Sequence, residues 1–182
     1  MESQFGRPSR TGPKTMTTFE LKPLHIDAVP GALERALRYR LLNEPSEAES
    51  ICLDVLQVDP ENQQAIATLI LALADRFEKS HAVEATRARE LLGRLRDPYE
   101  RVYYAGILYE RQAKAVLAQG AFGAEALAFD LLREAMRCYE QAEALRPPHN
   151  DDARLRWNTC ARLIMHRRLR AESRERAEPV LE

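Results

Sequence analysis

The chain has 182 residues, a length that suits one domain or a short array of repeats with a loose end. Its 45% hydrophobic content argues against wholesale disorder, and the recurrence of Ala, Leu, Glu and Arg beside only 7 glycines is typical of helices rather than sheets. Lysine and arginine number 27 against 28 acidic residues, so the net charge of -1 gives no overall reason to expect nucleic acid or an anionic membrane as a partner. We therefore predict an all-α fold.

Residues 1–23 are rich in Gly, Pro, Ser, Thr and basic residues and lack apolar periodicity, so they are expected to form a flexible arm. A helical domain is predicted over residues 24–176. Asp27 is expected to cap its first helix. Pro45 suits the first turn of a second helix, which Asp59 and Pro60 should end. The first hairpin is thus expected over about residues 28–58.

Two further hairpins are expected, over about residues 62–95 and 98–145, because proline and glycine interrupt the apolar periodicity between them. The stretch from Gly120 to Gly123 should be the turn of the last hairpin. Asn150 or Asp151 can cap a final helix, predicted over about residues 151–176, and residues 177–182 form a tail. Short connections between successive helices favour antiparallel hairpins.

A shared spacing links two of the predicted helices. Each carries a small residue, a core residue, a second core residue and a closing proline at the same offsets: Ala48, Cys52, Val55 and Pro60, then Ala135, Tyr139, Ala142 and Pro147. The helices before them share a small residue followed three positions later by an aromatic one, at Ala36 and Tyr39 and at Gly106 and Tyr109. This pattern resembles the tetratricopeptide repeat family, which implies that these residues pack where the two helices of each unit cross.

The resemblance is uneven along the chain. In the middle unit Ile70 stands where a small residue is expected, and the third unit has about 17 extra residues relative to the 34-residue period of the family. We therefore predict a divergent array of stacked hairpins with a C-terminal capping helix. An ordinary helical bundle, in which these alanines and prolines have no repeat-specific role, stays open as the alternative.

The resemblance also implies a binding groove, because the first helix of each tetratricopeptide unit lines the concave side of the array. Transferred to this sequence, the groove would be apolar with charged edges and formed by Leu33, Leu37, Arg40, Leu41, Ala67, Leu71, Asp75, Tyr103, Ile107, Glu110 and Arg111. The alternative is that these side chains pack against other helices. The carboxylate-clamp subtype is not expected, since its Lys, Asn and Arg positions correspond to Leu33, Leu37, Thr68, Glu100 and Tyr104.

No pattern in the sequence predicts catalysis. His25, His81, His149 and His166 are scattered without the spacing of a helical zinc site, and no phosphate-binding loop is present. Cys52, Cys138 and Cys160 are odd in number and well separated, which argues against a disulfide framework or a paired-cysteine metal site. We therefore expect a protein that is not an enzyme and has no cofactor.

The N-terminus lacks the apolar core of a secretory signal, and the longest apolar stretch, Leu69 to Ala74, is far shorter than the roughly 20 residues that span a bilayer. We expect a cytoplasmic protein with no membrane partner. An apolar groove is similar to that of the small tetratricopeptide chaperones of bacterial secretion systems. The leading hypothesis is an adaptor or chaperone-like module for protein–protein interaction that binds a peptide or helix of another protein.

Two other functions stay open. The array could be an architectural subunit of a homo- or hetero-oligomeric assembly. The C-terminal arginines could instead follow a nucleic-acid backbone, but Glu172, Glu175 and Glu178 interrupt the run and favour a solvated helix. The arginines concerned are Arg162, Arg167, Arg168, Arg170, Arg174 and Arg176. We rank nucleic acid last among the partners.

Overall fold

The computed structural model describes residues 18–78 and 81–171. In these two ranges the chain is all-α and has no strand, as predicted. A short 3-10 helix, Ile26–Ala28, precedes the first α-helix. The α-helices are α1 (Val29–Leu41), α2 (Pro45–Val58), α3 (Gln63–Ala74), α4 (His81–Leu92), α5 (Pro98–Gln119), α6 (Ala124–Leu145) and α7 (Asp152–Arg167).

Local sequence signals explain most of the helix starts. Pro30, Pro45 and Pro98 lie in the first turns of α1, α2 and α5, where the missing backbone N–H has no helical partner to lose. Asn62 and Asp97 cap α3 and α5, since their side-chain oxygens each accept a backbone N–H at 2.9 Å. These signals are short-range and therefore readable in the sequence.

Three predicted helix limits are wrong. Asp27 does not cap α1, because it lies inside the 3-10 turn and its own N–H is bonded to the ring of His25, which leaves Ala28 at the cap position. The apolar pattern predicts helices over about Asn62 to Phe77 and about Ala82 to Leu95, but α3 and α4 each end three residues earlier, and Phe77 and Leu95 are buried in the segments that follow. Their apolar character extended the predicted helices.

The capping helix also ends earlier than predicted, at Arg167 instead of residue 176. Arg168 takes a left-handed conformation with φ +54°, which stops the helix and turns the chain back. The N–H of Leu169 then donates to the carbonyl of Ile164 at 3.0 Å, and the Leu169 side chain is buried. The arm over residues 1–17, the end of the predicted helix over 172–176 and the tail over 177–182 lie outside the described residues.

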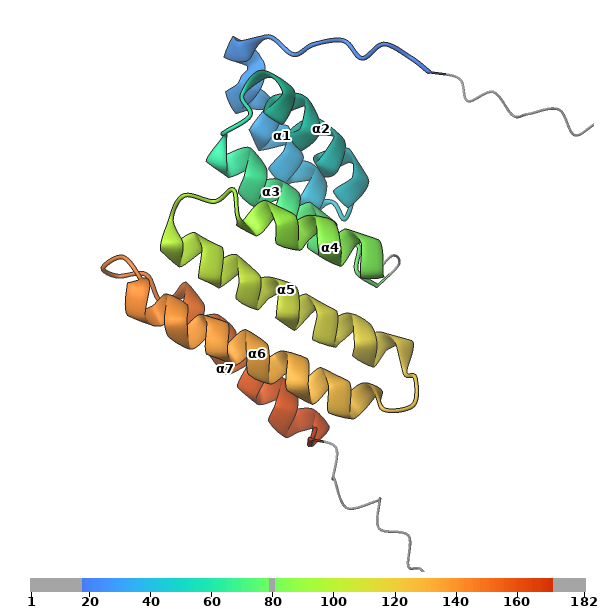
Figure 1. Cartoon of the computed structure of the whole chain (residues 1–182), viewed down its shortest axis with the longest axis vertical. Coiled ribbons are helices and arrows are strands. Elements are labelled where there is room, and N and C mark those ends of the chain that lie inside the picture. Colours follow the sequence, from blue (N-terminus) through green and yellow to red (C-terminus); the bar gives the residue numbers. More distant parts are fainter. Residues whose placement is uncertain (1–17, 79–80, 172–182) are drawn as a thin grey trace, which may run out of the picture.

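The helices form three antiparallel hairpins stacked in chain order, with α7 against the last of them (Figure 1). Each helix contacts the next one along the chain, and α1 also contacts α3 as α3 contacts α5. The first helices of successive hairpins are therefore neighbours, as stacking requires. The stacked-hairpin prediction is confirmed.

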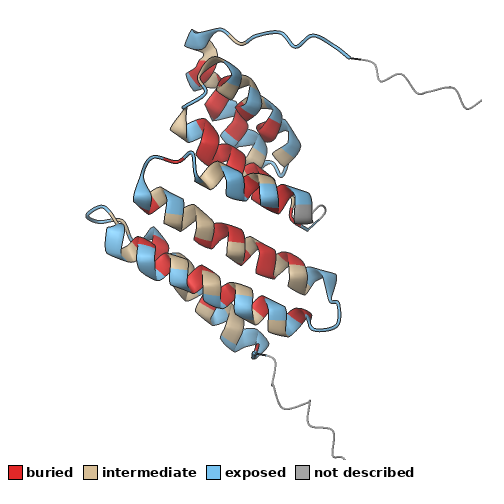
Figure 2. Ribbon diagram, in the orientation of Figure 1, coloured by how far each residue is buried: buried red, intermediate tan, exposed pale blue. Residues whose placement is uncertain are grey.

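The buried residues lie where helices pack together, both within and between the hairpins (Figure 2). One apolar cluster extends from α1 to α5 and includes Ala36, Ile70 and Leu108, and a second joins α5, α6 and α7 and includes Ile107, Leu132 and Cys160. Helix α5 contributes to both clusters. It therefore connects the two halves of the molecule.

Most residues that the repeat pattern assigned to helix crossings are buried. These are Ala36, Ala48, Cys52, Val55, Gly106, Ala135, Tyr139 and Ala142. Tyr109 is half-buried, whereas Tyr39, Pro60 and Pro147 are exposed. Gly106 and Tyr139 meet directly, since a Cβ added at Gly106 would stand 2.6 Å from a carbon of the Tyr139 ring.

Candidate functional site

The face formed by the first helices, α1, α3 and α5, is bridged by paired charges. Asp75 at the end of α3 accepts a hydrogen bond from Nε of Arg40 on α1 at 2.9 Å, and its other oxygen lies 3.3 Å from Nη2 of Arg111 on α5. The sequence placed all three residues at the edges of a groove. The structure brings them together as one bridge, which fixes the three helices beside one another.

Glu110, also predicted at the groove edge, lies inside the fold with no exposed surface. Its carboxylate accepts hydrogen bonds from Tyr139 Oη at 2.8 Å and from Lys114 Nζ at 2.5 Å, and Arg156 Nη1 of α7 approaches at 3.2 Å. Burial alone would raise the pKa of Glu110, but Lys114, Arg156 and Tyr139 together outweigh it and the pKa is lowered. Glu110 is thus an ionised link between α5, α6 and α7.

The apolar members of the predicted groove divide into core and surface. Leu33, Ala67 and Ile107 are buried, whereas Leu71 and Tyr103 are half-buried. Only Leu37 and Leu41 are exposed, to 38% and 88% respectively. What remains accessible on this face is therefore Leu37, Leu41, Leu71 and Tyr103 beside the bridge of Arg40, Asp75 and Arg111, and we call these seven residues the first-helix face.

A group of tyrosines at the start of α5 borders the first-helix face. The rings of Tyr99 and Tyr103 are stacked with centroids 5.5 Å apart, and Tyr104 meets Tyr103 edge-on at the same distance. Burial raises the pKa of both Tyr99 and Tyr104 to about 12, so these phenols remain protonated hydrogen-bond donors at neutral pH. Sequence reasoning did not assign Tyr99 to the groove, although its spacing from Tyr103 places both on one side of a helix.

A second charged network lies among α2, α4 and the turn between α3 and α4. Buried Glu49 pairs with Arg76 and, at 2.5 Å, with Arg87, and Glu84 lies 2.8 Å from Arg76 and 3.0 Å from Arg87. Sequence reasoning missed this network because its members are separated by up to 38 residues. It holds the first two hairpins together.

Two cavities open on the side of the second helices. One, of about 320 Å³, has a leucine floor between α2 and α4 that includes Leu53, Leu69 and Leu91. The other, of about 160 Å³, lies between α4 and α5 beside Leu92 and Leu108. Neither was expected from the sequence, since each depends on how neighbouring hairpins dock.

The cysteines are free thiols, and those of Cys52 and Cys160 are buried, which raises the pKa of each to about 12. Both thiols therefore stay protonated, unlike the thiolates that act as nucleophiles. Within residues 18–78 and 81–171, no group of three or more His, Cys, Asp or Glu residues could hold a metal ion. None of the helices in that part of the chain is both long and apolar enough to cross a bilayer.

Comparison of the chain with protein-family models, with curated proteins and with solved structures gives no match. The resemblance to tetratricopeptide repeats therefore stays a prediction, based on the spacing of residues such as Ala48, Gly106 and Ala135. Functional argument has to come from the surfaces of the molecule itself.

Proposed function

We propose that this chain is a protein-interaction module of the tetratricopeptide kind, an adaptor or chaperone-like protein that binds a peptide or helix of a partner on the first-helix face. The observation that carries the proposal is the exposure of Leu37 and Leu41 beside the charged bridge centred on Asp75. In protein interfaces, buried apolar side chains supply much of the binding free energy, and neighbouring charged side chains orient the partner.

The charged bridge supports the proposal through its rigidity. Arg40 and Arg111 are held by Asp75 before any partner arrives, so less side-chain entropy is lost on binding. Half-buried Leu71 and Tyr103 offer apolar and phenolic contact on the same side of the stack. A partner segment would add to these surfaces without rearranging the helices.

The test is affinity capture from the source cell with quantitative mass spectrometry, comparing wild type with Leu37→Glu. Because the carboxylate introduced at position 37 would lose its hydration when a partner binds over it, recovery of a true partner should fall roughly tenfold or more. The matched control is Leu127→Glu, which places the same charge at an exposed leucine of α6 away from this face. Unchanged melting temperatures confirm that both variants fold.

The proposal fails if both variants recover the same partners as wild type at the same level. A partner lost only from Leu127→Glu would place the interface on the last hairpin instead. Either result rejects the first-helix face while leaving the fold unaffected.

One observation favours the second candidate, an architectural subunit of an assembly. At the first hairpin, where no further hairpin covers the stack in the described residues, Leu42 is exposed to 63% and lies outside the first-helix face. Terminal units of repeat arrays ordinarily have polar outer surfaces. Light scattering would support this candidate if the wild-type mass exceeded that of one chain and Leu42→Glu returned it to one chain.

A further inference from the structure

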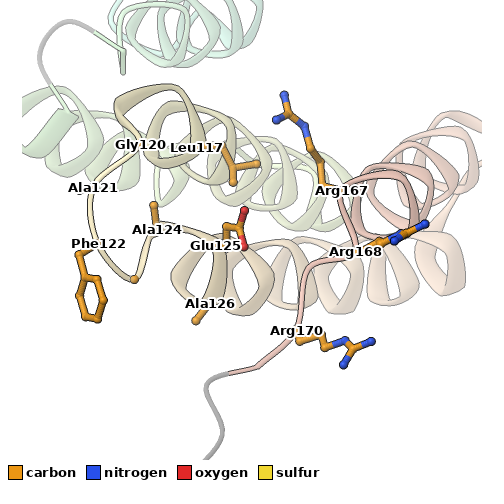
Figure 3. Close-up of a pocket in the computed structure, with 11 residues that line it drawn as sticks. Leu117, Gly120, Ala121, Phe122, Ala124, Glu125, Ala126, Arg167, Arg168 and Arg170 are labelled. Atoms are coloured by element: carbon orange, nitrogen blue, oxygen red, sulfur yellow. The ribbon is translucent and has the colours of Figure 1, made fainter.

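A cavity of about 560 Å³ opens where the turn between α5 and α6 meets the end of α7 (Figure 3). Leu117 and the turn residue Phe122 line one side, and Arg167, Arg168 and Arg170 line the other. Phe122 is fully exposed. The cavity lies at the far end of the long hairpin and shares no residue with the first-helix face.

The conformation of the chain at the end of α7 leaves the three arginines exposed. Arg168 adopts the left-handed conformation, its N–H donates to the carbonyl of Met165 at 3.3 Å, and Leu169 is anchored in the core. Because Leu169 points inward, its neighbours Arg168 and Arg170 are exposed. The end of α7 thus places all three arginines along one side of the opening, with their guanidinium groups pointing in different directions (Figure 3).

The charges at this cavity are unbalanced. Further up α7, Arg154 pairs with Glu143 and Arg156 with Glu110. In contrast, none of the three cavity arginines forms a salt bridge with another residue of the described ranges. Among the described residues, Glu125 is the single carboxylate in the lining. Helix α6 follows its N-cap Gly123 without a side-chain cap, which adds the positive end of a helix dipole. The cavity is therefore complementary to an anionic ligand.

We propose that this cavity binds an acidic segment of a partner protein, with Asp or Glu side chains on the arginines and an apolar side chain against Phe122 and Leu117. Arginine pairs well with carboxylates because its planar donors match their two oxygens. The cavity volume, within the usual range of ligand pockets, is much larger than a single inorganic anion requires. The exposed Phe122 ring has no favourable contact to make with an inorganic anion.

A peptide also fits better than a nucleic acid. A nucleic-acid backbone needs a track of positive charge along several phosphates. Here Glu125 lies within the cavity, so negative charge interrupts the surface beside the arginines. A short acidic segment can avoid this carboxylate.

The experiment is fluorescence anisotropy with the full chain and a labelled peptide of eight glutamates around one phenylalanine. Changing Arg167, Arg168 and Arg170 together to glutamine should weaken binding roughly tenfold or more, because charged contacts at the centre of the site are lost. The matched control changes Arg35, Arg38 and Arg133 to glutamine, which removes the same charge from exposed positions elsewhere and should leave affinity within about twofold. Phe122→Ala should weaken binding by roughly threefold.

Three results would overturn the proposal. Wild type could show no saturable binding, the two triple variants could weaken equally and so reveal unspecific charge attraction, or oligothymidylate could bind more tightly than the peptide and indicate nucleic acid. Circular dichroism melts check that each variant folds. Because Leu37→Glu leaves the cavity intact and should bind the acidic peptide like wild type, failure here is distinguishable from failure of the proposed function.

Discussion

At the scale of single residues, the contact between Gly106 and Tyr139 is the closest helix approach among the described glycines. The Tyr139 ring has little room to move, since its hydroxyl donates to Glu110 at 2.8 Å and its ring lies 6.0 Å from that of Tyr103. Glycine is therefore required at position 106 by space and not by backbone conformation. This is the role that the repeat resemblance gives to a small residue in a first helix.

Gly106→Ala should destabilise the protein, although alanine is ordinarily better than glycine inside a helix by about 1 kcal/mol. The added methyl would stand 2.6 Å and 2.8 Å from two ring carbons of Tyr139, and overpacking of this kind costs roughly 1–3 kcal/mol. We expect the melting temperature to fall by roughly 2–6 °C in calorimetry. Gly31→Ala is the control, because nothing lies within 4 Å of its new methyl, and it should leave the melting temperature unchanged or higher. A higher melting temperature for both variants would contradict this prediction, because it would mean that the Tyr139 ring moves to make room for the methyl group.

At the scale of helices, charged links between elements supplement the apolar core. Asp75 joins α1, α3 and α5, Glu49 joins α2 to α4 and the turn before it, and Glu110 joins α5, α6 and α7. Asp75 and Glu49 each pair with two arginines from other parts of the chain. Glu110 pairs with Lys114 of its own helix and with Arg156 of α7. Such links fix the register of the hairpins, because a shifted helix would leave a charge unpaired.

Glu110→Gln should loosen α7 from the last hairpin and destabilise the protein by about 3 kcal/mol, since Lys114 and Arg156 lose their counter-charge. Denaturant titrations would measure the change. Glu143→Gln is the control, because its partners Arg146 and Arg154 are at the surface, and its unfolding midpoint should hardly move.

The effect of Glu110→Gln should also depend on pH. Because the pKa of Glu110 is lowered by folding, its contribution to stability is present above the ordinary glutamate pKa of about 4.3 and is lost as pH falls through the lower folded value. The difference in unfolding free energy between wild type and variant should therefore be constant near neutral pH and shrink in acid. A difference that grew in acid would contradict the ionised link.

At the scale of the whole molecule, α5 is the junction between two apolar clusters. Its contact with α4 is the least extensive between successive helices and leaves the cavity of about 160 Å³ beside Leu108. In stacked arrays stability depends on the interfaces between neighbours, so the weakest interface is where the halves can uncouple.

Leu108→Ala should uncouple the two halves by enlarging that cavity, at a cost of roughly 2–5 kcal/mol. The single tryptophan, Trp157 in α7, reports on the C-terminal half, whereas helical circular dichroism reports on all helices. We expect the two signals to give one unfolding midpoint in wild type and separate midpoints in the variant, with circular dichroism changing first. Exposed Leu145→Ala should keep a single midpoint. Coincident midpoints in Leu108→Ala would show that the halves remain coupled.

The stacked hairpins were predictable because their signals are local. Prolines at helix starts, the caps Asn62 and Asp97, and the glycines of the α5–α6 turn act over a few residues, and apolar periodicity defines the helices between them. Errors arose where the chain was apolar but not helical, as at Phe77 and Leu95, and where Arg168 ended α7 by adopting a conformation that arginine rarely takes.

The sequence by itself determined the all-α class and the hairpin order, since apolar periodicity and helix-breaking residues are properties of neighbouring turns. It assigned Gly106 and Tyr139 separately to helix crossings, but their direct contact was decided by the tertiary structure. Only the tertiary structure decided which groove residues are core, because burial of Leu33, Ile107 and Glu110 depends on helices far away in the chain. The same holds for the pairing of Glu110 with Arg156, 46 residues apart, and for the arginine cavity, where the end of α7 meets a turn more than 40 residues before it. Contacts of this range leave no periodic trace in a single sequence.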